Sequence, residues 1–215
     1  MIALNITLWT GLFCLVDKIL STTRLEGIYY LIHAGHNALI VHSTAREVYK
    51  TFMDFSNISA EPTNYYALEL VFALHIYHIL MYWRKFRFDD WLHHALMIGI
   101  ALPIGGILPA GTLLGFSLFF TTGLPGGIDY FLLFLTRNEI IRRNIEKKIN
   151  TALAIWIRSP GCVAHAALTF AYLNMQKGEV FYYYLGLLTA VLNYWNGQYF
   201  MSQVVYDAGK REILG

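Results

Sequence analysis

Cysteine is scarce in this sequence. Only two occur among 215 residues, Cys14 and Cys162, and both stand inside apolar segments. Two isolated thiols in apolar surroundings exclude the disulfide framework of a small secreted protein, and they lack the spacing of a zinc knuckle. We interpret both as small packing residues.

Charge is also scarce. Charged residues make up 14% of the chain and the formal net charge is +2, whereas 56% of the residues are hydrophobic and 16% aromatic. So small a net charge, spread between apolar runs, excludes the basic stripe of a nucleic-acid-binding protein. The apolar content exceeds what a soluble domain needs and predicts an all-α, multi-pass membrane protein.

Long linkers, low-complexity tracts and internal repeats are absent, which predicts one compact helix bundle. The N-terminus has no basic region and no small-residue cleavage site, so we expect the first apolar run to be retained. That run is short and is suited either to spanning the membrane or to lying in the interface, so six or seven spans remain open. The seven apolar stretches cover about residues 2–17, 27–49, 64–84, 91–107, 109–136, 151–175 and 179–206.

Glycine and proline predict two irregular places in the bundle. The segment Gly123–Gly127, which contains Pro125, should kink the fifth stretch. Pro103 and Pro109, with two adjacent glycines between them, indicate a tight hairpin between the fourth and fifth stretches.

Lysine and arginine alternate between the connections. The connections after the first, third and fifth stretches and the C-terminal end are the basic ones, and the others carry little basic charge. By the positive-inside tendency these basic segments are cytosolic and the N-terminus faces away. The basic residues that carry the pattern are Lys18, Arg24, Arg84, Lys85, Arg87, Arg137, Arg142, Arg143, Lys147, Lys148, Lys210 and Arg211.

Two acids and two adjacent histidines stand at the start of the fourth stretch. On a helix, Asp89 and Asp90 lie three or four residues before His93 and His94, so a carboxylate can orient an imidazole. Adjacent helical residues diverge by about 100°, so the two rings should have different roles. Ionisable groups at a membrane boundary are costly and tend to be functional.

Further polar residues lie inside the apolar stretches. His33, His36 and Asn37 share a face of the second stretch, and His75 and His78 are three apart in the third. These residues can hydrogen-bond between helices, or they can line a polar chamber that leads to the histidine pair. Both interpretations remain open.

Acidic, basic and amide residues also occur in the last three stretches. Asp129 and Arg158 lie in adjacent stretches and predict a buried ion pair. Asn193, Asn196 and Gln198 make part of the seventh stretch polar. These amides can close the chamber or pair with one another.

These motifs together resemble the TLC domain, which is found in ceramide synthases, translocating-chain-associated proteins and smaller TLC-domain proteins. The resemblance covers about residues 25–207, and the small TLC-domain proteins resemble the chain more closely than ceramide synthases do. It divides the chain into an N-terminal apolar segment (1–24), the TLC domain (25–207) and a cytosolic tail (208–215). The residues that carry it are Asp89, Asp90, His93, His94, the run Gly126–Tyr130 with Leu132 and Leu133, and the run Asn193–Tyr199.

The resemblance implies a six-helix membrane barrel, here with an additional short N-terminal helix, in the endoplasmic reticulum or another endomembrane. In ceramide synthases the histidine pair serves acyl transfer from acyl-CoA to a sphingoid amine. His93 and His94 match that pair by position, and Asp129 is similar to an acid of the second motif.

An acyltransferase is the first functional hypothesis. Its catalytic residues would be His93, His94, Asp90 and Asp129, with acyl-CoA as co-substrate, no bound cofactor, and a long-chain amine or lysolipid as acceptor. Basic connections can hold the phosphates of coenzyme A or anionic headgroups. The expected substrate-binding residues are His33, His36, His75, His78, Asp89, Arg158, Asn193 and Asn196.

Two other classes compete. A non-catalytic lipid-binding protein would use the same histidines and acids to recognise a headgroup or regulate membrane-lipid composition. Eight histidines also suggest metal-dependent lipid oxidation, but the sequence has a single adjacent His-His pair where a di-iron site needs several. We therefore expect no metal site.

Overall fold

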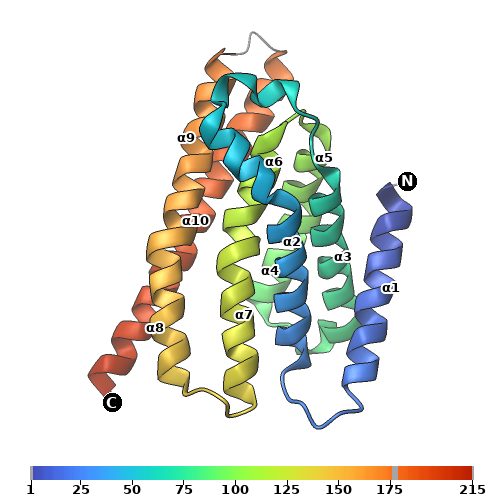
Figure 1. Ribbon diagram of the computed structural model, residues 1–215, viewed down its shortest axis with the longest axis vertical. Helices are drawn as coiled ribbons and strands as arrows, with labels where there is room; N and C mark the ends of the chain where they lie inside the picture. The colour runs from blue at the N-terminus through green and yellow to red at the C-terminus, as the bar shows by residue number, and fades with distance from the viewer. Residues whose placement is uncertain (1, 176–178, 215) are drawn as a thin grey trace.

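The computed structural model describes residues 2–175 and 179–214, and over these residues the chain is helical throughout, without a strand. The helices join end to end into seven rods that stand side by side (Figure 1). Each apolar stretch predicted from the sequence is found as one rod. The rods are α1 (Ile2–Leu20), α2 (Ile28–Met53), α3 (Tyr65–Tyr82), α4 with α5 (Phe88–Leu96, Leu102–Ile107), α6 with α7 (Thr112–Leu118, Leu124–Arg137), α8 with α9 (Arg143–Leu153, Ser159–Met175) and α10 (Val180–Leu214).

Three features differ from the sequence prediction. The sixth rod begins at Arg143, well before residue 151, because its first turns are amphipathic instead of apolar. The hairpin lies at residues 108–111 and Pro103 is inside α5, so only Pro109 marks the turn. Gly111 has φ 53°, and a side chain there would run into the backbone carbonyl of Ile58. The predicted tail continues α10 as far as Leu214, and Gly215 lies outside the described residues.

Three rods contain a π-helical segment at their centre, and each segment ends two residues before a proline. A helical proline lacks an N–H and clashes with the carbonyl four residues earlier. The wider π turn moves that carbonyl and lets the rod continue. The segments are η3 (Met97–Ala101) before Pro103, η4 (Phe119–Gly123) before Pro125 and η5 (Ala154–Arg158) before Pro160.

The surface of the bundle is apolar in the way expected beside lipid. Segments Ile2–Leu20, Tyr65–Lys85 and Thr112–Arg137 are long and apolar enough to cross a membrane by length and composition. Large apolar side chains cover the outer face of α1 at helical spacing. They are Leu4, Leu8, Leu12, Leu15 and Ile19, all exposed. That all seven rods cross the membrane stays a prediction.

The inner face of α1 is attached to α3 by polar contacts. The Asn5 amide donates to a Glu69 carboxyl oxygen (2.9 Å), and the Thr10 hydroxyl donates to the Ala73 carbonyl (3.3 Å). Asp17, which is also buried, contacts α3 one to two turns further along. Polar contacts of this kind hold membrane helices together where apolar surfaces gain little by meeting.

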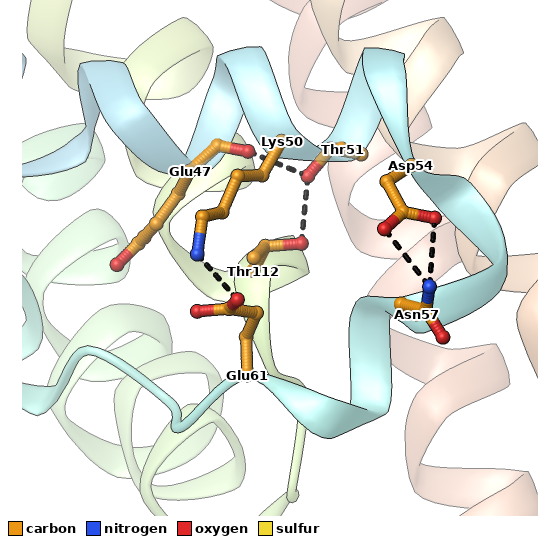
Figure 2. A network of polar contacts seen from close by, with 7 residues as sticks. All are labelled: Glu47, Lys50, Thr51, Asp54, Asn57, Glu61 and Thr112. Atoms are coloured by element: carbon orange, nitrogen blue, oxygen red, sulfur yellow. Dashed lines mark hydrogen bonds and ion pairs between the residues drawn. The ribbon is translucent and has the colours of Figure 1, made fainter.

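A polar network closes the end of the bundle remote from the α1–α2 connection (Figure 2). Thr51 donates its hydroxyl to the Glu47 carbonyl (2.8 Å), and the hydroxyl of Thr112 lies 2.8 Å from that of Thr51. Lys50 forms an ion pair with Glu61, at the far end of η1 (Phe55–Ala60). The network fixes the turn after α2 against the start of α6.

Candidate functional site

Four histidines of α3 and α4 meet in two pairs. Nε2 of His75 is 3.3 Å from Nε2 of His93, and Nδ1 of His78 is 3.3 Å from Nε2 of His94. The rings of His93 and His94 are perpendicular, with an interplanar angle of 88°. Their divergence around α4 is therefore as expected, yet both rings reach α3 because His75 and His78 lie on one face of that helix.

Backbone carbonyls decide where the protons lie on three of these rings. His33, His75 and His94 each place Nδ1 within 2.6, 2.8 and 2.7 Å of the carbonyl oxygen four residues earlier. A carbonyl only accepts, so Nδ1 must carry the proton in each ring. In the neutral ring Nε2 then holds the lone pair. The helix itself therefore sets the direction of the hydrogen bonds between histidines.

The aspartates do not orient the histidines through their carboxyl groups, as the sequence had suggested. The Asp90 carboxyl accepts the backbone N–H of Arg87 (2.9 Å), which caps α4. His94 is held by the backbone carbonyl of Asp90 instead. Asp89 is exposed and makes no hydrogen bond or ion pair with the residues that the structure describes.

The histidines of α2 and α3 are packed among aromatic rings instead of lining an open chamber. His33 stacks on His78 with ring centroids 4.2 Å apart and 17° between the planes. The ring centroids of Tyr29 and Tyr130 lie 4.0 and 4.3 Å from the ring centroid of His33. We call this group the histidine cluster: His33, His75, His78, His93 and His94 with Tyr29 and Tyr130. All its histidines are buried except His93, which is exposed.

His36 lies apart from the cluster. Its Nδ1 is 2.9 Å from Oδ1 of Asn37, which also accepts the hydroxyl of Thr122 (3.0 Å). A side chain at Gly126 would come within 2.8 Å of the Asn37 amide nitrogen. The glycines after Pro125 therefore let α7 approach α2 closely at this asparagine.

Asp129 and Arg158 do not form the ion pair expected from the sequence. They interact electrostatically, but they are not within 4.0 Å of each other, and Oδ1 of Asp129 and Nε of Arg158 have no hydrogen-bond partner. A second carboxyl group, that of the fully buried Glu146, lies beside Asp129. Lys147 is 3.7 Å from Glu146 and 3.4 Å from Asp207. Asp129 thus belongs to a larger charged group between α7, α8 and α10.

The amides of α10 contact other helices than those of the histidine cluster. Asn193 donates to the Ser117 hydroxyl of α6, and Gln198 donates to the Ser159 hydroxyl (2.9 Å). Oδ1 of Asn196 is buried without a partner. Asn193 and Gln198 therefore hydrogen-bond to serines of other helices, and none of these amides pairs with another amide in the described part of α10.

Sequence reasoning missed several residues around the cluster. Tyr29 was given no role from the sequence, although its position four residues before His33 placed it on the same helix face. Glu146 was hidden in a basic connection. Asp17 is an acid inside an apolar stretch, which is itself a signal of an unusual site.

The histidine cluster offers imidazole nitrogens, but not a preformed metal site. Over residues 2–175 and 179–214, no three histidine, cysteine, aspartate or glutamate side chains are arranged to hold one metal ion. Comparison of the chain with protein-family models, with curated proteins and with solved structures finds no match.

Proposed function

We propose that the chain is a multi-pass membrane protein of the TLC-domain type that transfers an acyl group from acyl-CoA to a long-chain amine or a lysolipid. In this proposal all seven rods cross an endomembrane such as the endoplasmic reticulum, six of them as a barrel. The observation that carries the proposal concerns His93, the exposed histidine of the cluster. Its ring makes a hydrogen bond through one nitrogen only.

The proton positions make His93 a suitable base. Nδ1 of His75 donates to the Val71 carbonyl (2.8 Å), so Nε2 of His75 is an acceptor. Nε2 of His93, 3.3 Å away, must then carry the proton of that hydrogen bond. The lone pair of His93 is left on Nδ1, which no group in the described part of the chain engages.

His94 has the opposite character. Its Nδ1–H donates to the carbonyl of Asp90, and its Nε2 accepts from Nδ1 of His78. Both nitrogens are occupied and the residue is 5% exposed. We therefore assign proton transfer to His93 and a positioning role to His94.

The reaction balances with a single base. The acceptor nitrogen attacks the thioester carbonyl, and Nδ1 of His93 takes the proton that this nitrogen loses. The carbon–sulfur bond breaks, and the same proton passes to the thiolate, which leaves as coenzyme A thiol. A lysolipid hydroxyl reacts in the same way. The exposed Arg84, Lys85 and Arg87, just before α4, are suited to the phosphates of coenzyme A.

The test uses purified protein with labelled acyl-CoA and a panel of long-chain amines and lysolipids. His93→Ala should lower the transfer rate at least about 100-fold, as expected for loss of a general base. His94→Ala should lower it less, and Asp90→Asn less still. His42→Ala is the matched control, because His42 is an exposed histidine of α2 outside the cluster, and it should leave the rate unchanged.

Two results would overturn parts of the proposal. Equal, measurable rates in wild type and His93→Ala would show that His93 is not the base. No transfer to any acceptor, with folded protein, would favour the alternative of a non-catalytic lipid-binding protein.

A further inference from the structure

Asp17 of α1 takes no part in the proposed acyl transfer, yet several hydrogen bonds hold its carboxyl group. It is 3% exposed and is the last of the polar α1 residues that contact α3. The hydroxyls of Tyr77 and Tyr82 both donate to Oδ2, and the hydroxyl of Ser21 donates to Oδ1 (3.1 Å). Three donors on one buried carboxyl group fix its position and theirs.

The two tyrosines that Asp17 holds are also in contact with the histidine cluster. The ring of Tyr77 is 5.4 Å from that of His78. The ring of Tyr82 is 5.1 Å from that of Tyr29, which lies 5.0 Å from His78. His78 in turn donates to His94. A continuous set of contacts therefore runs from Asp17 to the histidine pair.

We propose that Asp17 is a positioning residue for the histidine cluster, so that α1 is a part of the site. Asp17 holds the two tyrosine rings, and these rings confine His78 and its hydrogen bond to His94. Its relevance to catalysis rests on the proposed acyl transfer, but the positioning itself is measurable without any reaction.

A control of the same kind exists on the same pair of helices. Asn5 also contacts a buried group of α3, the carboxyl of Glu69, at 2.9 Å. It lies about three turns from Asp17 along α1. Asn5→Leu removes one polar contact between α1 and α3 and Asp17→Leu removes two, and only Asp17→Leu releases the tyrosines beside His78.

The experiment measures how fast diethyl pyrocarbonate modifies each histidine of the detergent-solubilised full chain, by mass spectrometry. In wild type, exposed His93 should react quickly and buried His78 and His94 slowly. Asp17→Leu should speed modification of His78 and His94 at least about tenfold, since the loss of even one hydrogen bond to a buried group corresponds to that factor and Asp17 accepts three. His165 of α9, 2% exposed, reports any overall loosening and should not change.

Each outcome decides the proposal. A local increase at His78 and His94 in Asp17→Leu, but not in Asn5→Leu, supports it. Unchanged rates, an equal effect of Asn5→Leu, or an equal rise at His165 overturns it. If Asp17→Leu does not fold, Asp17→Asn replaces it in the test. Asparagine keeps one oxygen acceptor, so the modification rates of His78 and His94 should still rise above those of wild type, by less than about tenfold. Absence of acyl transfer in wild type would refute the proposed function and leave this measurement intact.

Discussion

At the scale of single residues, the atom that accepts a hydrogen bond matters more than the residue that supplies it. The spacing between Asp90 and His94 correctly placed the two residues together, but the acceptor is the backbone carbonyl and not the carboxyl group. Spacing alone cannot distinguish these, because both oxygens lie on the same turn of the helix. The carboxyl group instead accepts the backbone N–H of Arg87 and caps the start of α4.

A second residue-scale feature is the space left by Gly115 of α6. A side chain there would occupy the position of the Glu47 carboxyl group. We expect Gly115→Ala to lower the free energy of unfolding by about 1–3 kcal/mol, since overpacking displaces the half-buried side chain of Glu47. The measurement is thermal or denaturant unfolding in detergent, and the double variant Gly115→Ala, Glu47→Ala should recover part of the loss.

Gly35 of α2 provides the control. A side chain at this exposed helical position meets nothing within 4 Å. Gly35→Ala should therefore stabilise the protein by up to about 1 kcal/mol through helix propensity alone. Similar losses in Gly35→Ala and Gly115→Ala would show that the contact with Glu47 is not the cause.

At the scale of elements, the sequence could predict where rods occur but not how each is built. The predicted kink at Pro125 is a π-helical segment, and two more such segments precede Pro103 and Pro160. Hydropathy does not report hydrogen-bond pattern, and a proline is compatible with a kink, a break or a wider turn. A hydropathy pattern also assigns the amphipathic start of α8 to a loop, so Glu146 was not recognised as part of a helix.

The π-helical segment η5 can be tested at its proline. Pro160 is exposed, so Pro160→Ala costs little packing and supplies an N–H for the carbonyl of Trp156. We expect a gain of about 1 kcal/mol in unfolding free energy, less than the cost of about 3 kcal/mol for a proline in a regular helix, because η5 already relieves the clash. Hydrogen exchange of the amides of residues 154–159 should slow.

Pro62 is the matched control for this change. It is exposed and lies in the connection between η1 and α3, outside any helix. Pro62→Ala should leave exchange in residues 154–159 unchanged. If Pro160→Ala also leaves it unchanged, the π-helical segment is set by packing and not by the proline.

At the scale of the whole molecule, the basic connections gather at one end of the bundle. The α1–α2, α3–α4 and α7–α8 connections and the end of α10 lie together, and η1 lies at the opposite end (Figure 1). The fold therefore groups the same segments that the alternation of charge assigned to one side. The sequence could predict this grouping because successive rods joined by short connections run antiparallel. The first, third and fifth connections then lie on the same side.

We expect this end to be cytosolic. A tag added after the C-terminus should be accessible to antibody when only the plasma membrane is permeabilised, and so should a tag in residues 138–142. A tag inserted at residues 61–64, after η1, should be protected until all membranes are opened. Protection of the C-terminal tag with exposure of the tag at 61–64 would show the opposite orientation.

The contacts of α1 with α3 also determine how α1 is aligned. Lipid tails offer no preference for one depth or rotation of an apolar helix over the next, so its outer face of leucines could slide by a turn, about 5.4 Å, at little cost. Asn5, Thr10 and Asp17 meet successive turns of α3, and a shift by one turn would break all three contacts at once. Three polar side chains thus fix the alignment of a helix whose outward leucines do not.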